Sequence, residues 1–225
     1  MPTPARLSDL NPDALGVDAV DRILRRIGRL GVPLSPGVVI DPHGGLRPDR
    51  QAGESMFLHV DVRASGLALT IADLCRYAQS GDTADWGADA GAEDALLTVG
   101  EALWSRPIDE DSGWTVDDLR AALAEDDEPA DPLRLAVGCA VARWVASQGG
   151  ALTTGEVAAL ASLTHDAVRQ AVKREQLAAP VEQVGSVRRA MVAADDARRW
   201  LGARGVPGWR PRGPEQQLEY IAPRR

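Results

Sequence analysis

The chain has 225 residues, of which 44% are hydrophobic and 26% are charged, and its formal net charge is −8 at pH 7. This length allows one large domain or two small ones, and the apolar content is ordinary for a soluble protein. The sequence contains no run of about 18 apolar residues, so no transmembrane helix is expected. The N-terminus lacks the charged start and apolar stretch of a signal peptide. Cys75 and Cys139 lie in apolar stretches, and we expect buried free thiols in a cytoplasmic protein rather than a disulfide.

The N-terminal part of the chain predicts mostly helices. Residues 1–16 are polar and contain prolines, so an irregular lead-in is expected before an amphipathic helix at Val17–Leu30. The expected elements that follow are strands at Val38–Ile40 and Met56–Val62, helices at Leu67–Ala78, Ala92–Trp104 and Thr115–Ala124, and connectors at residues 33–53, Gly81–Gly91 and Glu125–Asp131. Thr115 is the expected N-cap of its helix. Leu133–Ser147 is strongly apolar and predicts a helix that is either core of the first part or a brace between two parts.

No catalytic constellation stands out in the sequence. His43 stands beside Gly44 and Gly45, but a single histidine without Cys or His at ligand spacing does not predict a metal site. His59 lies in an apolar, strand-like run, which favours a structural role. The sequence contains no phosphate-binding loop, dinucleotide fingerprint or nucleophile elbow. We therefore expect a protein that is not an enzyme and that needs no metal or cofactor.

Leu152–Leu177 predicts two short helices joined by a tight turn. Thr154 is the expected N-cap of the first helix and Thr164 that of the second, with the turn beginning at Ser162. Leu163 is expected to fill the gap between the helices. The other residues expected to face inward are Val157, Ala158, Leu160, Ala161, Val168, Ala171 and Val172.

The outward face of the second helix is then basic. It would carry His165, Arg169, Gln170, Lys173 and Arg174. Arg and Gln side chains pair with the edges of guanine and adenine, whereas Lys and Arg bind phosphates. The pattern therefore indicates a helix that enters the major groove of DNA.

A hairpin and a third helix follow. Ala179–Val192 predicts two short strands around Gly185 and Ser186, with Arg188 and Arg189 beside the turn. Alternate residues of a strand point to opposite faces, so only one of these arginines is expected to meet DNA. Ala194–Gly205 predicts a helix, with Asp195 as its expected cap and Ala197, Trp200 and Leu201 on its apolar face.

This order of elements resembles the excisionase/MerR-type winged helix-turn-helix DNA-binding domain. The resemblance rests on the small residue Ala158, the turn at Ser162, the aliphatic Val168, the hairpin, and the helix with Trp200-Leu201, and it covers residues of about 150–206, a quarter of the chain. Ser162 departs from the pattern, because glycine is common there, and the alanine-rich inner face gives a thin core. The resemblance implies contacts with DNA from Thr164, His165, Arg169, Gln170, Lys173, Arg174, Arg188 and Arg189.

The charge of the chain is divided between its two parts. Residues 1–147 hold 13 Arg against 25 Asp and Glu, a net charge of −12, whereas residues 148–225 hold 11 Arg and one Lys against 8 Asp and Glu, a net charge of +4. The positive charge therefore lies where the helix-turn-helix pattern lies. The charge is small, so non-specific affinity for DNA should be weak at physiological salt.

Together these features predict a mainly α protein with a winged helix-turn-helix C-terminal domain. The expected parts are a mostly helical acidic domain (1–131), a connecting helix (132–149), the winged helix-turn-helix (150–206) and a Pro/Arg-rich tail (207–225). The expected function is sequence-specific binding of double-stranded DNA by a homodimer, as a transcriptional regulator or a phage or mobile-element control protein. The alternative is an interaction module that docks a protein partner through the winged helix and residues 1–131. An enzyme with a site in the N-terminal part is a third reading, and no membrane contact is expected.

Overall fold

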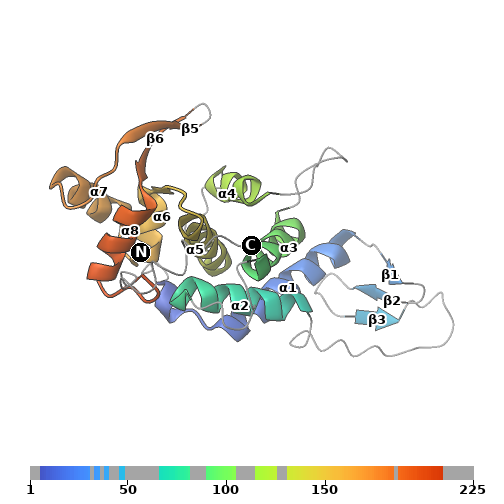
Figure 1. Cartoon of the computed structure of the whole chain (residues 1–225). Helices are drawn as coiled ribbons and strands as arrows, with labels where there is room; N and C mark the ends of the chain where they lie inside the picture. The colour runs from blue at the N-terminus through green and yellow to red at the C-terminus, as the bar shows by residue number, and fades with distance from the viewer. Residues whose placement is uncertain are drawn as a thin grey trace, which may run out of the picture.

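The protein is mainly α-helical, as the sequence predicts (Figure 1). The computed structural model describes residues 6–30, 33–35, 38–40, 46–48, 66–81, 90–104, 115–125, 131–184 and 187–209. Its helices are α1 (Pro12–Leu30), α2 (Gly66–Ser80), α3 (Ala90–Leu103), α4 (Val116–Glu125), α5 (Pro132–Ser147), α6 (Thr154–Leu160), α7 (His165–Lys173) and α8 (Ala194–Ala203), with a 3-10 turn η1 (Leu7–Asp9) before α1. Its strands are β1 (Pro33–Ser35), β2 (Val38–Ile40), β3 (Leu46–Pro48), β4 (Leu152–Thr153), β5 (Val181–Val184) and β6 (Val187–Val192).

The first helix begins earlier than predicted. α1 starts at Pro12 rather than Val17, and η1 precedes it, so the expected irregular lead-in is wrong for residues 7–16. The reason is local: Asn11 caps the helix by accepting a hydrogen bond from the Ala14 amide at 3.1 Å, and Pro12 occupies the first helical position, which tolerates its missing N–H. Asn11 and Pro12, which form this start signal, precede the apolar residues of Val17–Leu30 from which the helix was predicted.

The predictions for the helices α2 to α5 are confirmed, with ends that differ by up to two residues. Thr115 caps α4 as expected: its hydroxyl accepts from the Asp118 amide, and the Asp118 carboxylate accepts from the Thr115 amide. The strand at Val38–Ile40 is confirmed as β2, but β1 and β3 flank it where a loop was predicted, in an antiparallel sheet of order β1-β2-β3. Met56–Val62, His43 and His59 lie outside the described residues.

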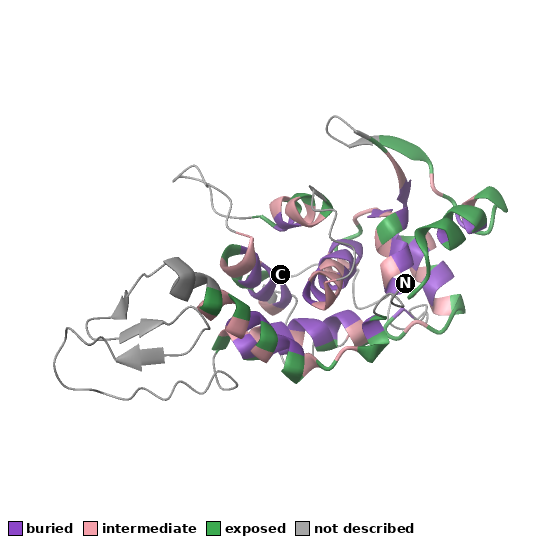
Figure 2. Ribbon diagram, turned by 180° about the vertical axis from the view of Figure 1, so that it is seen from behind, coloured by how far each residue is buried: buried purple, intermediate pink, exposed green. Residues whose placement is uncertain are grey.

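Helix α5 lies at the centre of the molecule and contacts helices on both sides. It packs against α2, α3 and α4 and also against α6 and α8 (Figures 1 and 2). A helix that is apolar on nearly all sides is buried on nearly all sides, and most side chains of α5 are indeed inaccessible. One cluster of buried side chains therefore runs from Leu7 to Trp209. Because both parts of the chain share this cluster, their division into separate domains stays a prediction.

Both cysteines are buried free thiols, which confirms the expectation. Cys75 lies on α2 and Cys139 on α5. Burial disfavours the thiolate and raises the pKa of Cys75 to about 11 and that of Cys139 to about 12. Among the described residues, no helix is both long and apolar enough to cross a membrane.

Among the described residues, Arg143 on α5 is the most deeply buried charged residue, with 4% of its surface exposed. It donates hydrogen bonds to the carbonyls of Ala78 and Gln79 at 2.6 and 3.2 Å, and to that of Pro207 at 2.8 Å. It also lies over the ring of Trp209, at 5.2 Å from the centroid. Arg143 thus ties the C-terminal end of α2 to the segment that follows α8, where a cation also suits the helix dipole.

The segment that Arg143 holds needs glycine at position 208. Gly208 has φ +74°, and a Cβ atom there would lie 2.2 Å from the carbonyl oxygen of Ser80 and 2.9 Å from the Arg143 guanidinium. Both the left-handed backbone and the close approach exclude a side chain. The contact between the two parts of the chain therefore depends on backbone packing as well as on the guanidinium.

A second polar contact joins the N-terminal part to α6. Arg120 on α4 forms a two-bond ion pair with Glu156, with Nε and Nη2 each 2.6 Å from a carboxylate oxygen. Its Nη2 also donates to the carbonyl of Ala151 at 2.9 Å. Both side chains are largely buried, at 22% and 17% exposure, so the pair is screened less than a surface pair. The start of α6 is therefore held from the N-terminal part of the chain.

Candidate nucleic-acid interface

The two helices predicted at Leu152–Leu177 are present as α6 and α7, but the cap of α6 is Thr153 rather than Thr154. The Thr153 hydroxyl accepts from the Glu156 amide at 3.1 Å, and the Glu156 carboxylate accepts from the Thr153 amide at 2.6 Å. This reciprocal pair needs a Glu three residues after the cap, a spacing that Thr153 satisfies and Thr154 does not. Thr164 caps α7 as predicted, since its hydroxyl accepts from the Ala167 amide at 3.2 Å.

The turn between α6 and α7 begins at Ser162, as predicted. Ser162 has φ +53°, a left-handed conformation that is strained for any residue other than glycine. The amide of Leu163 donates to the carbonyl of Ala158, and that of Ser162 to the carbonyl of Ala159, at 2.9 and 3.0 Å. These two bonds form the Schellman arrangement that ends many helices.

The prediction that Leu163 fills the gap between the helices is wrong. The left-handed residue before it reverses the chain direction, and Leu163 emerges at the surface with 41% exposure. Five other residues predicted to face inward are buried as expected, and Thr154 is buried with them: Val157, Ala158, Leu160, Val168 and Ala171. Ala161 and Val172, also predicted to face inward, are half-buried.

Replacing Ser162 by glycine should stabilise the protein. Glycine adopts the left-handed conformation without the steric cost of a Cβ atom, and part of this gain is offset by the larger entropy of the unfolded chain. We expect the free energy of unfolding to rise by about 0.5–1 kcal/mol in urea titrations followed by circular dichroism. The matched variant Ser162→Ala keeps the Cβ atom and should give no gain. Equal stabilities of the glycine and alanine variants would show that the strain at this position is negligible.

Helix α7 has a buried face and a polar face, as predicted. Val168 and Ala171 are buried, and the side chains on the opposite face are exposed: His165, Arg169, Gln170, Lys173 and Arg174. Arg169 has an acidic neighbour, Asp166, at 3.9 Å, but both side chains are well exposed, so this pair holds Arg169 only weakly.

The predicted hairpin is confirmed as β5 and β6, which pair in antiparallel register. Strand β4, which precedes α6, pairs with the far end of β6 through Leu152 and Val192, so the sheet has the order β4-β6-β5. Helix α8 follows as predicted, but Asp195 does not cap it. The helix already begins at Ala194, and Asp195 in its first turn forms an ion pair with Arg198 at 3.0 Å instead.

A groove of about 560 Å³ lies between α7 and the hairpin. Five of the eight residues predicted to contact DNA line it: His165, Arg169 and Lys173 from α7, and Arg188 and Arg189 from β6. The other three do not line it: Gln170 is exposed elsewhere on α7, Arg174 is exposed directly after the end of α7, and the hydroxyl of Thr164 is used as the cap. The remaining lining residues were not predicted as site residues and are Thr153, Thr154, Gly155, Val172, Ala179, Val181 and Ala190.

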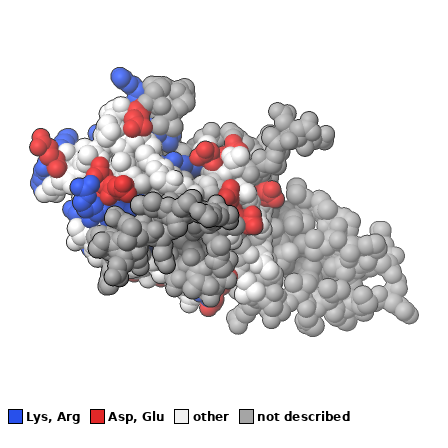
Figure 3. Space-filling view, in the orientation of Figure 1, with Lys and Arg blue, Asp and Glu red and all other residues white. Residues whose placement is uncertain are grey.

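The groove is electropositive. Four of its lining side chains are permanently charged cations at neutral pH, and among the described residues that line it none is acidic. His165 is held at one side of the groove by a hydrogen bond of 2.8 Å between its Nε2 and the hydroxyl of Thr154. Thr154 is itself buried, and its contact with His165 was not predicted, because the sequence indicated only a capping role for this residue. Figure 3 shows Lys and Arg side chains gathered on this end of the molecule, although acidic side chains lie among them.

The two hairpin arginines differ in their surroundings. Arg188 is exposed, whereas Arg189 is half-buried and stands directly opposite Glu182 in the register. Opposite charges on directly paired strand residues stabilise a sheet, and like charges destabilise it. Arg188 is thus the arginine that is free to meet a ligand, and Arg189 is placed to brace the hairpin.

Reversing each charge should therefore give different results. We expect Arg188→Glu to weaken binding of duplex DNA about tenfold or more with little change in melting temperature. Arg189→Glu should lower the stability of the fold by up to about 1 kcal/mol, because it places two carboxylates opposite each other, and should weaken DNA binding less. Fluorescence-anisotropy titration and thermal unfolding of both variants measure the two effects. Equal and negligible losses of affinity would show that the hairpin does not face DNA.

No group of three or more His, Cys, Asp or Glu side chains that could hold a metal ion occurs in the part of the chain that the structure describes. Comparisons with protein-family models, with curated proteins and with solved structures find no match for this chain. The geometry of the groove and the charges around it are therefore the basis for any statement about function.

Proposed function

We propose that this protein binds double-stranded DNA through the groove between α7 and the β5–β6 hairpin, as a winged helix-turn-helix protein. The observation that carries the proposal is the convergence of four cations, from helix α7 and strand β6, on one groove whose described lining residues include no acidic residue. Phosphate contacts from Lys and Arg supply most of the affinity of proteins for DNA. The arrangement provides such contacts on both walls of the groove.

The dimensions of α7 agree with this proposal. His165, Arg169 and Lys173 recur every four residues and form one stripe along the groove. At 1.5 Å per residue, the stripe is about 12 Å long, and the major groove of B-DNA is about 12 Å wide. Helix α7 protrudes from the body of the molecule in Figure 1, so a duplex can approach its exposed face.

Caps and an ion pair hold the starts of α6 and α7, which favours recognition of a defined sequence. Its N-terminus is capped by Thr164, and the start of α6 is held by the Thr153–Glu156 pair and by Arg120. Side chains on such a supported helix can read base edges without first ordering the backbone. We therefore propose sequence-specific binding, as in a transcriptional regulator or a control protein of a phage or mobile element.

The distribution of charge limits non-specific binding of DNA. The chain as a whole carries a net charge of −8, so its long-range field repels phosphate. The cations of the groove attract the duplex at short range, within a Debye length of about 8–10 Å. The affinity of this protein for DNA should therefore depend on correct docking of the groove more than that of a uniformly basic protein does.

A salt titration of the full-length protein tests this function. A labelled random-sequence duplex pool is selected for binding, and anisotropy is then measured with selected and scrambled duplexes between about 50 and 200 mM salt. We expect tighter binding of the selected duplex and an affinity for both that falls as salt increases. Absence of binding at the lowest salt would refute the proposal and would favour the alternative, in which the same groove docks a protein partner.

A further inference from the structure

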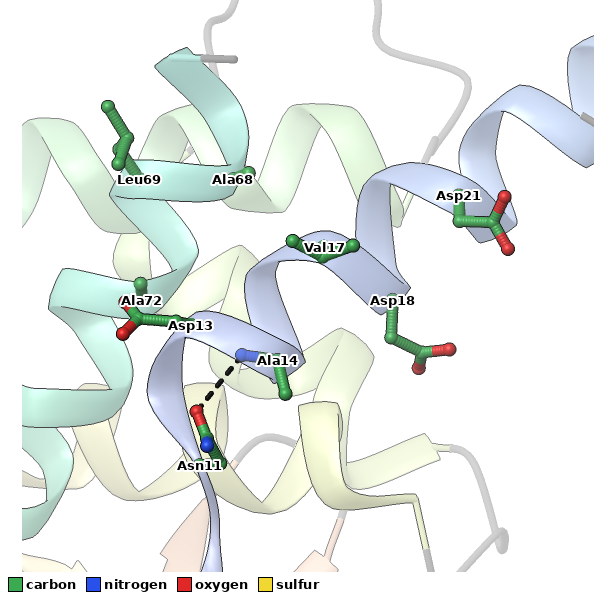
Figure 4. Close-up of a pocket in the computed structure, with 9 residues that line it drawn as sticks. All are labelled: Asn11, Asp13, Ala14, Val17, Asp18, Asp21, Ala68, Leu69 and Ala72. Carbon is green, nitrogen blue, oxygen red and sulfur yellow. Dashed lines mark hydrogen bonds between the residues drawn. The ribbon is translucent and has the colours of Figure 1, made fainter. Parts of the chain in front are cut away.

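A second groove, of about 750 Å³, lies between α1 and α2, away from the candidate DNA site (Figure 4). Its apolar wall includes Val17 of α1 and Leu69 of α2, and Leu69 is 51% exposed. Asp18 and Asp21 of α1 line the same groove. An apolar surface in a hollow that is rimmed by charged residues is the kind of surface that binds another protein.

The charges of α1 change sign at the middle of the helix. Its first half, residues 12–21, holds Asp13, Asp18 and Asp21 and no basic residue. No acidic residue follows Asp21 within α1, and Arg22 and Arg25 begin a basic half. The midpoint of Pro12–Leu30 falls at residue 21, so the change of sign coincides with the centre of the helix.

The charge pattern of α1 is complementary to that of a second α1 helix that runs in the opposite direction. Two α1 helices that lie antiparallel about a twofold axis near residues 21 and 22 place the acidic half of each against the basic half of the other. In this register Asp18 of one copy faces Arg25 of the second copy, twice by symmetry. A parallel arrangement would instead place like charges together.

The charged side chains on this face are available for such an exchange. Asp18 pairs with Arg22 at 2.7 Å and Asp21 with Arg25 at 2.5 Å, within one helix. The side chains of Asp18 and Arg25 are 52% and 53% exposed. Exposed pairs of this spacing contribute little to stability, so replacing them by pairs with a second copy costs little.

We propose that the face formed by α1 and the exposed Leu69 binds a second copy of this chain in an antiparallel, twofold-symmetric dimer. Burial of the apolar wall supplies the driving force, and the divided charge of α1 selects the antiparallel orientation. The proposal does not depend on DNA binding, because no residue of the α7 groove takes part in it. Its test is therefore made without DNA.

Charge reversal at one facing pair tests the dimer. The wild-type protein is expected to be a dimer in analytical ultracentrifugation. Asp18→Arg and Arg25→Asp should each weaken the dimer about tenfold or more, because each places two like-charged pairs across the interface. An equimolar mixture of these two variants should form a heterodimer, since both facing pairs are then of opposite charge. The double variant Asp18→Arg/Arg25→Asp should dimerise again by itself.

Controls separate this surface from general effects of charge and folding. Asp117→Arg on the exposed start of α4 and Arg199→Asp on α8 make the same charge changes elsewhere and should leave the dimer unchanged. Leu69→Ala should weaken it without a change in circular dichroism. A monomeric wild type, or a dimer that Asp18→Arg and Arg25→Asp leave intact, would overturn the proposal. Failure of the mixture and of the double variant to dimerise would equally overturn the antiparallel pairing.

Discussion

Replacing Arg143 by methionine should lower the free energy of unfolding by about 3 kcal/mol. Methionine retains much of the length of the side chain but none of its donors. The carbonyls of Ala78, Gln79 and Pro207, which accept from Arg143 at 2.6–3.2 Å, would then lose this donor in a buried position. An unsatisfied buried acceptor lowers the stability by about 1–3 kcal/mol. Removal of the buried, desolvated charge offsets part of this loss.

The protonation state of Arg143 does not change this expectation near neutral pH. Burial lowers the pKa of its guanidinium to about 10, against 12.5 for the unperturbed group. Because this pKa is lower in the folded than in the unfolded protein, the folded state loses the proton first as the pH rises. The contribution of Arg143 to the free energy of unfolding therefore changes only as the pH approaches about 10 and above. The loss on replacement should therefore be constant between pH 6 and pH 8.

Urea unfolding of the full-length variant, followed by circular dichroism, measures the effect. Arg199→Met is the matched control, because Arg199 is 75% exposed and its ion pair is with the neighbouring Asp196 on α8. Its replacement should change the stability by less than about 0.5 kcal/mol. Equal losses for the two variants would show that the bonds of Arg143 to α2 and to the segment after α8 contribute nothing to the fold.

The second large effect is expected from Arg169 on the exposed face of α7. If this side chain contacts a base, Arg169→Ala should weaken binding of the selected duplex by about 1–3 kcal/mol, a factor of about 5–150, and should reduce the preference over a scrambled duplex. Its ion pair with Asp166 spans 3.9 Å between exposed side chains, so little stability is lost with it. Circular dichroism and melting temperature should stay unchanged.

Lys173 lies one helical turn further along the same stripe and serves as the comparison. Its ammonium is expected to contact phosphate, so Lys173→Ala should weaken all duplexes to a similar extent and reduce the slope of log affinity against log salt by about one unit. Arg174→Ala is the control, because Arg174 is exposed beside the groove without lining it. Wild-type affinity of both the Arg169 and the Lys173 variant would contradict the placement of α7 in the major groove.

Local signals in the sequence were sufficient for most of the secondary structure. Helical spacing of apolar residues predicted α2 to α5, and the cap residues Thr115 and Thr164 were identified correctly. The strongly apolar character of residues 133–147 predicted a helix in the core or between the two parts of the chain, and α5 is buried. Errors occurred where two local signals compete: Thr153 and Thr154 are adjacent possible caps, and only the position of Glu156 distinguishes them.

The candidate site was predictable only in part. The exposed stripe of α7 follows from the periodicity of one helix, and His165, Arg169 and Lys173 were therefore identified in advance. The exclusion of Gln170 and Arg174 from the groove depends on where the hairpin lies relative to α7. No periodicity within one element carries that information, and the same holds for Thr154, whose contact with His165 joins two helices.

What the sequence determined by itself is thus the set of helices, the basic face of α7 and the divided charge of α1, because each depends on residues that are near neighbours in the chain. What only the tertiary structure decided is the formation of the cationic groove and the use of Arg143 as a buried tie between α2 and the segment after α8. These depend on contacts between residues far apart in sequence, and such contacts form only when the elements pack around the shared core.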